Sequence, residues 1–214
     1  MSELSNLELL TTTRTVRRRL DLTRPVERSD VTACLEVALQ APNASNQQWW
    51  AWVVVDDAAT RKRMADVYRA GMTERAEQIA RMDGTPTGYT VKTREQQIQV
   101  SVNHLRDHLH EVPVLVVPTI FGRLDGADIA TQASRWGSVI PAVWSFMLAL
   151  RAKGMGSAWT TTHLLHEAEM AEVLGIPFDQ VTQVGLFPVA YTIGTTFRPG
   201  VRDASGDAIR WNRW

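Results

Sequence analysis

The sequence predicts an α+β fold, in which a mixed β-sheet is flanked by helices, and three observations support this class. Long segments with helical spacing of apolar residues alternate with short apolar runs, without the strict strand-helix-strand repetition of a parallel sheet. No internal repeat, low-complexity tract or interdomain linker interrupts the chain. A length of 214 residues, with 44% hydrophobic and 21% charged residues, is typical of one globular core. We therefore expect residues 1–214 to form a single domain.

The first half of the chain predicts mainly helices, with one short strand. Asp30 is a suitable N-cap for the second helix, because its carboxylate can accept a hydrogen bond from a free backbone N–H in the first turn. The run Trp-Val-Val-Val is apolar and β-branched, which is typical of a buried strand. The expected elements are helices over residues 4–13, 30–40 and 61–82, a strand over 52–55, and a Gly/Pro loop over 84–88.

The second half predicts a buried central helix between two strands. Residues 129–153 have apolar side chains nearly all round the helix, so we expect this helix to pack against a second subunit as well as its own sheet. Gly154 is a natural residue to end it. The expected elements are helices over 92–111, 129–153 and 166–174, strands over 112–118 and 181–191, and a tail over 192–214.

The composition excludes several classes of function. The 23 basic residues equal the 23 acidic ones, and no broad basic face is evident, which argues against a nucleic-acid partner. The single cysteine, Cys34, excludes a disulfide framework or a cysteine metal site within one chain. The longest apolar stretch, residues 139–150, is too short to span a bilayer, and the N-terminus lacks a signal-like apolar core. We therefore expect no membrane association and a cytoplasmic location.

Two polar segments are candidates for ligand binding. Residues 14–19 place four arginines and a threonine within six positions, which suits a phosphate but also a solvated basic turn. Residues 41–50 carry proline, asparagine and glutamine between a helix and a strand, which suits a flat heteroaromatic ring but also an ordinary loop. Neither segment decides between its two interpretations alone.

Together the segments resemble the FMN-dependent nitroreductase family. Four motifs occur in the family's order: Thr13-Arg14-Thr15-Val16-Arg17, Ala41-Pro42-Asn43-x-x-Asn46-x-Gln48-Trp49-Trp50, Gly154-Met155-Gly156-Ser157-Ala158-Trp159 and Leu174-Gly175-Ile176-Pro177. The resemblance implies a nitroreductase-like α/β sandwich that forms an intertwined homodimer. Residues 60–112 carry no such motif, and we expect them to be the variable region that supplies a lid over the active site.

The resemblance implies FMN as the cofactor and a set of residues that contact it. These are Arg14, Thr15 and Arg17 for the phosphate and ribityl chain, Pro42, Asn43 and Asn46 from the partner subunit, Trp159, Thr160 and Thr161 along the isoalloxazine ring, and Arg202, preferred to Arg198, for the phosphate. Arg19 stands where the family usually has Phe. The threonine run is similar to that of the iodotyrosine deiodinase branch.

The leading functional hypothesis is an FMN-dependent oxidoreductase. NADPH or NADH would deliver a hydride to flavin N5 and leave, and a small electron-poor acceptor such as a nitroaromatic or quinone would follow by ping-pong kinetics. We expect the acceptor to meet Tyr68, Met72, Tyr89 and Phe121. No acid-base residue is assigned, and no metal is expected, because His104 and His108 lack a comparable third ligand.

Three alternatives stay open. A flavin enzyme of the same fold could carry out a specialised reduction, such as reductive dehalogenation, or remove hydrogen from a biosynthetic intermediate. The protein could instead bind or store flavin without turnover. A nucleic-acid module is the least consistent with the neutral composition.

Overall fold

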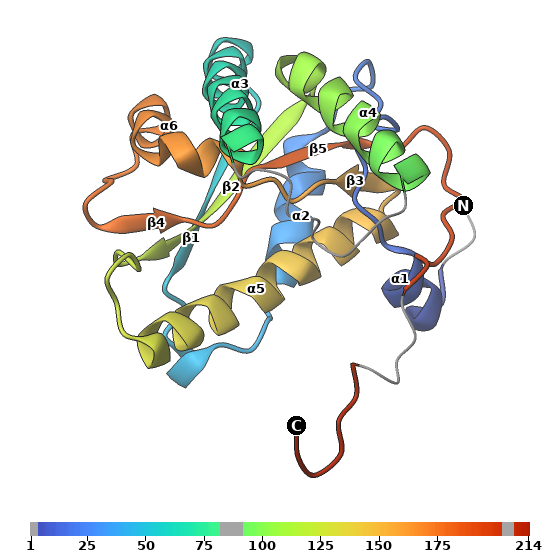
Figure 1. Ribbon diagram of the computed structural model, residues 1–214. Helices are drawn as coiled ribbons and strands as arrows, with labels where there is room; N and C mark the ends of the chain where they lie inside the picture. Colours follow the sequence, from blue (N-terminus) through green and yellow to red (C-terminus); the bar gives the residue numbers. More distant parts are fainter. Residues whose placement is uncertain (1–3, 82–91, 203–207) are drawn as a thin grey trace.

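The computed structural model describes residues 4–81, 92–202 and 208–214, and the predicted α+β class is confirmed (Figure 1). The helices are α1 (Asn6–Thr12), α2 (Arg28–Ala38), α3 (Ala58–Arg81), α4 (Lys92–His108), α5 (Ile129–Ala152) and α6 (Glu167–Leu174), with short 3-10 helices η1 (Ala44–Asn46), η2 (Leu109–Glu111) and η3 (Thr162–His166). The strands are β1 (Trp50–Val55), β2 (Val114–Phe121), β3 (Met155–Ser157), β4 (Val181–Gln183) and β5 (Phe187–Tyr191). None of the described helices is long and apolar enough to cross a membrane.

The strands form one sheet in the order β1-β2-β5-β3, and β4 also pairs with β2. Each named pair is antiparallel, for example with Val53 opposite Val117 and Val114 opposite Val189. The named strand pairs therefore differ from the mixed sheet that the sequence predicts. Among the described residues, parallel pairing occurs in an isolated bridge between Gly122 and Val181. Apolar runs look alike in either direction, so composition could not reveal strand direction.

Strand β2 is buried on both faces, and its alternate residues enter two different cores. Val114 and Val116 belong to the core under α2 and α5, while Leu115 and Val117 belong to the core under α3, α4 and α6. This follows from the two-residue period of a strand. Figure 1 shows the resulting three layers, with α3, α4 and α6 above the sheet and α5 below it.

Helix α5 begins at an Asp128 cap, whose carboxylate accepts a hydrogen bond from the Thr131 N–H. It ends as predicted before Gly154, which adopts a φ of 75°. The helix is not buried on all sides within one chain, because Ile140 and Trp144 remain 42% and 39% exposed. Burial of this face against a second subunit stays a prediction.

Two local expectations need correction, and one strand was not expected. Glu27, not Asp30, is the N-cap of α2, and Asp30 instead accepts hydrogen bonds from Lys153 Nζ (3.0 Å) and the Tyr191 hydroxyl (2.9 Å). The expected strand over 181–191 is two strands, because Leu186 turns to pair with Thr160 and leaves the β2 ladder. The three-residue strand β3 was too short for a periodic signal.

Candidate functional site

The arginine-rich segment lies against β3. Helix α1 starts with a capping box between Ser5 and Glu8, and it stops at Thr12, just before the arginines. The Val16 N–H donates to the Ser157 carbonyl over 2.8 Å. A Cβ on Gly156 would lie 2.9 Å from Val16 Cγ2, so a glycine is needed for this close approach. The arginines therefore sit beside the loop that leaves β3.

The C-terminal segment brings Arg202 and Arg14 together. Arg14 Nη1 donates to the carbonyl of Arg198 over 3.1 Å. A Cβ on Gly200 would lie 2.4 Å from Arg202 Nη1 and 3.1 Å from Arg14 Nη1, so both guanidinium groups surround this glycine. Arg198 takes part only through its main-chain carbonyl, which accepts the bond from Arg14, because its side chain is exposed. No carboxylate of the described residues forms an ion pair with these two guanidinium groups, which leaves their charge available to an anion.

Arg17, three residues after Arg14 in the chain, is half-buried. Its Nη1 contacts Ser101 Oγ of α4 at 3.5 Å, and Thr15 is exposed beside it. Burial lowers the pKa of Arg17, and the neighbouring Tyr68 opposes this shift. An arginine stays charged at neutral pH in spite of such a shift. A cavity of about 170 Å³ opens here, lined by Thr15, Val16, Arg17, Arg18, Arg19, Ser101 and Phe197.

We call residues 159–162, after β3, the threonine loop. Trp159 Nε1 donates to the Val184 carbonyl (3.2 Å), and its ring packs on Phe187. The Thr160 hydroxyl is buried and donates to the Leu186 carbonyl over 2.8 Å. These two side chains are therefore committed to the fold, and Thr161 is exposed. Any contact of Trp159 or Thr160 with a ligand would have to come mainly from the backbone.

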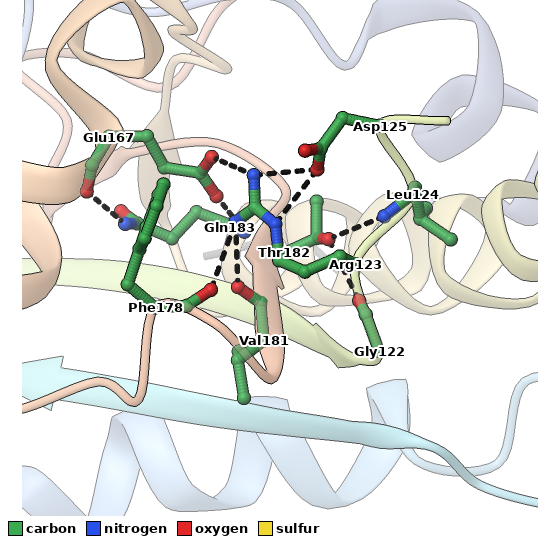
Figure 2. A network of polar contacts seen from close by, with 9 residues as sticks. All are labelled: Gly122, Arg123, Leu124, Asp125, Glu167, Phe178, Val181, Thr182 and Gln183. Carbon is green, nitrogen blue, oxygen red and sulfur yellow. Dashed lines mark hydrogen bonds and ion pairs between the residues drawn. The ribbon is translucent and has the colours of Figure 1, made fainter. Parts of the chain in front are cut away.

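A polar network joins the start of α6 to β4 and to the end of β2 (Figure 2). Glu167 accepts hydrogen bonds from Arg123 Nη2 and from the Gln183 N–H, each over 2.8 Å, and its carbonyl accepts from Gln183 Nε2. His163, which follows the loop directly, is fully buried, and burial lowers its pKa to about 4, a shift that a contact with Gln183 opposes. His163 is thus neutral at physiological pH, so its burial introduces no unpaired charge.

The second predicted segment, residues 42–48, is a strained loop that packs on α5. Ser45, Asn46 and Gln48 all have positive φ angles near 51°, which non-glycine residues rarely adopt. Asn43 Oδ1 accepts from the Gln48 N–H (2.9 Å), and the Ala44 N–H donates to Ser138 Oγ (3.0 Å). Clusters of such backbone strain occur preferentially at functional sites.

The two polar segments do not meet within one chain. Pro42 and Asn46 are exposed, and their loop lies at the N-terminal end of α5, whereas Arg14 follows α1 near the other end of that helix (Figure 1). A single chain therefore carries two separate groups of the predicted cofactor-binding residues, each a candidate partial site. One contains Arg14, Arg17, Arg202 and the threonine loop, and the other contains residues 42–48.

The structure places three of the four residues expected to meet a substrate, and they lie apart from one another. Tyr68 is 3% exposed in the core under α3, beside Arg17 and Thr162, and a contact of its ring with a substrate stays a prediction. Met72 lines a cavity of about 380 Å³ between α3 and α4. Phe121 is 50% exposed at the end of β2, near the loop of residues 42–48, since its N–H donates to the Trp49 carbonyl. Tyr89 lies outside the described residues.

Sequence reasoning missed two residues beside the strained loop. Arg135 lies over the Trp49 ring at 3.3 Å, and Ser138 binds the Ala44 N–H. Both line the small cavity between this loop and α5. Their spacing of three residues places them on one helix face, which was a usable signal.

The chain is similar to known proteins in sequence and in fold. A family model described as the nitroreductase family matches residues 10–191. The chain is similar to iodotyrosine deiodinase bound to FMN and 3-iodo-L-tyrosine, with 22% identity and a TM-score of 0.71 over 97% of this chain and 99% of that one. It is also similar to a BluB-like flavoprotein from Clostridium difficile 630, with 16% identity and a TM-score of 0.72 over 98% and 100% of the two chains. A third similar structure is the FMN and NADPH-dependent nitroreductase NfnB from Sphigopyxis sp. strain HMH, with 19% identity and a TM-score of 0.69 over 99% and 100%. At these identities the structural likeness establishes a shared fold.

Proposed function

We propose, because the chain belongs to the nitroreductase family of flavin-dependent oxidoreductases, that it holds FMN, takes electrons from NADPH or NADH, and passes them to an electron-poor acceptor. Nitroaromatic compounds and quinones are the acceptor classes that we expect. Bound FMN would supply the redox chemistry, since its ring accepts a hydride and releases electrons to a second compound. The residues of the chain bind and orient this group and limit access of water to it.

The observation that carries the proposal is the convergence of Arg14 and Arg202 around Gly200. Two guanidinium groups without a carboxylate partner among the described residues repel each other, and a dianionic phosphate would relieve that repulsion. The Val16 N–H, two residues after Arg14, binds the Ser157 carbonyl, two residues before the threonine loop, so a ring attached to the phosphate could lie along that loop. The donor set therefore fits FMN.

We also propose that the protein acts as a homodimer, because the second partial site is incomplete in one chain. Residues 42–48 form a strained polar loop far from Arg14, and the exposed face of α5 carries the large apolar side chains Ile140 and Trp144. Pairing two copies through this face would bury apolar surface and could bring the loop of one chain to the arginines of the other. Sedimentation of wild type and Trp144→Glu tests this proposal. A wild-type monomer that binds FMN would contradict it.

The first experiment is a visible absorption spectrum of the purified protein, followed by anaerobic addition of NADPH or NADH. Bound flavin that bleaches supports the proposal, whereas bound flavin that does not bleach indicates another reductant or a binding role. Arg14→Gln should weaken FMN binding, and Arg24→Gln is a matched control, because Arg24 is exposed and lies over the Tyr191 ring away from the cluster. Absence of flavin even after reconstitution with FMN would overturn the proposal.

Steady-state kinetics test the order of events. One shared site for the reductant and the acceptor requires that the first leave before the second enters, so parallel double-reciprocal lines are expected. Intersecting lines would show that both compounds bind together, and would exclude a shared site.

A second candidate function is reductive dehalogenation, and the exposed Thr161 within a run of three threonines favours it. A hydroxyl near the reactive edge of the ring could stabilise a partly reduced flavin. Release of iodide from 3-iodo-L-tyrosine by the dithionite-reduced protein would support this candidate. Rapid turnover with quinones and no iodide release would favour the first.

A further inference from the structure

We propose that Arg19 and Arg151 are positioning residues, which hold the C-terminal segment 193–198 so that Arg202 reaches Arg14 at the anion site. This inference rests on the proposed function for the identity of the anion. Neither arginine belongs to the cluster around Gly200, so each acts through the segment that it holds. The structure gives four observations for this role.

Arg19 binds three carbonyl groups of one turn. Its Nε donates to Ile193 (2.9 Å), its Nη1 to Thr196 (3.0 Å) and its Nη2 to Gly194 (2.7 Å). Each guanidinium nitrogen is thus engaged by main chain, in the fork geometry that an ammonium group cannot reproduce. Gly194 has a φ of 72°, and a Cβ there would lie 3.0 Å from Arg19 Nη2, so the turn is shaped around this guanidinium.

Arg151 holds the same turn from α5. It is only 6% exposed, and its Nη2 donates to the Thr195 carbonyl over 2.8 Å. Burial lowers the pKa of Arg151, and the nearby charge of Arg19 lowers it further. A buried charge beside a like charge is unfavourable without compensation, and among the described residues neither arginine pairs with a carboxylate. Carbonyl groups and an aromatic ring provide the compensation instead.

That aromatic ring belongs to Phe197. The Arg19 guanidinium carbon lies 4.1 Å from the ring centroid and that of Arg151 lies 4.5 Å from it, so one ring receives two cations. We call Arg19, Arg151 and Phe197 the tail clamp. Arg19, two residues after the first sequence motif, stands where the family that the chain resembles usually has Phe. In this chain the aromatic group is therefore on the C-terminal segment and the cation follows the motif.

The tail clamp leads directly into the anion site. Phe197 precedes Arg198, whose carbonyl accepts the Arg14 bond, and Gly200 and Arg202 follow. Release of Phe197 would free the segment between the clamp and Arg202, and ordering it again on ligand binding would cost conformational entropy. The clamp therefore preorganises Arg202 for the phosphate.

The test compares Arg19→Lys, Arg19→Gln, Phe197→Leu and the control Arg24→Gln, using FMN and riboflavin as the two ligands. Riboflavin lacks the phosphate, so a positioning effect at the anion site changes FMN affinity more than riboflavin affinity. We expect each clamp variant to bind FMN about tenfold more weakly, with about a twofold change or less for riboflavin. Arg19→Lys keeps the positive charge, so weaker FMN binding by this variant would reflect lost positioning and not a lost attraction for anions.

A second readout does not require flavin. Hydrogen exchange of residues 193–202 in the flavin-free protein should become about tenfold faster in Arg19→Lys, and stay unchanged in Arg24→Gln. Equal loss of FMN and riboflavin affinity, or unchanged exchange in Arg19→Lys, would overturn the inference. Wild-type protein that binds no FMN would instead refute the proposed function, and the exchange measurement would still decide whether the clamp orders the tail.

Discussion

Replacing Gly71 with alanine tests how closely α3 packs on the threonine loop. Gly71 lies on the face of α3 that meets η3, and a Cβ there would be 2.1 Å from the Thr162 carbonyl oxygen and 2.8 Å from its carbon. Both atoms belong to the backbone, so no flexible side chain can move away. The added methyl group must displace the end of the threonine loop or the helix by about 1 Å.

The expected loss of stability follows from two opposing terms. Overpacking of a core by one methyl group costs about 1–3 kcal/mol, and a clash with backbone belongs to the upper part of that range. Alanine in place of glycine inside a helix stabilises the folded state by about 1 kcal/mol, because of its higher helix propensity. The net loss is about 2 kcal/mol, which lowers the unfolding midpoint by about 4–8 °C in a chain of this size.

Urea unfolding and thermal unfolding measure the stability, and titration with FMN measures the effect on the proposed site. Gly137→Ala in α5 is the control for helix propensity within one chain, because a Cβ there meets no atom of the same chain within 4 Å. Gly137 shares a helix face with Ile140, so sedimentation of this variant checks that the proposed dimer contact is kept. We expect this control to gain about 0.5–1 kcal/mol from helix propensity. If Gly71→Ala were as stable as Gly137→Ala and bound FMN like wild type, the close packing of α3 on the loop would be refuted.

Three further predictions concern the residues around the loop. Glu167→Gln should lower the free energy of unfolding in urea by about 1–2 kcal/mol, because its partner Arg123 is mostly buried. The control Glu169→Gln, whose side chain is 61% exposed, should lower it by less than about 0.5 kcal/mol. Equal losses would contradict the network of Figure 2. His163 has a folded pKa of about 4, below the ordinary 6.5, so the unfolded chain takes up the proton first, and stability should fall by up to about 1.4 kcal/mol per pH unit as pH drops from 6.5 to 4. In His163→Gln this contribution to the pH dependence of stability should disappear. If urea unfolding at several pH values gave the same pH dependence in this variant as in wild type, carboxylates and not His163 would be its source. Arg202→Ala should weaken FMN binding about tenfold, whereas Arg198→Ala should leave it within about twofold, since Arg198 contributes its carbonyl; similar losses in titrations of the two variants would contradict this distinction.

Periodicity and end signals predicted most of the helices and strands. The expected helices over 30–40, 61–82 and 129–153 correspond to α2, α3 and α5, with ends within a few residues. Gly154 ended α5 as expected, because only a residue that tolerates positive φ fits there. Local preferences decide such features, so they can be read from a window of the chain.

Side-chain roles around the site were less predictable. Tyr68 looked like a pocket residue but is buried in the core, and Thr160 uses its hydroxyl to hold the Leu186 carbonyl. Arg19 gave no signal of a structural role, because its three carbonyl partners lie about 175 positions away in the sequence. Burial and hydrogen bonding depend on residues that are distant in the chain, and no local pattern reports them.

The amino-acid sequence by itself determined the α+β class, the order of the helices, and the four motifs that carry the family resemblance. Tertiary structure decided which of the motif residues meet. The antiparallel pairing of β3 with β5 brings the start of the threonine loop beside Val16, and the tail clamp brings Arg202 back to Arg14. The contacts of Val16 with Ser157 and of Arg14 with the segment around Gly200 join residues separated by more than a hundred positions, and their loop-closure entropy is offset only when the whole core forms.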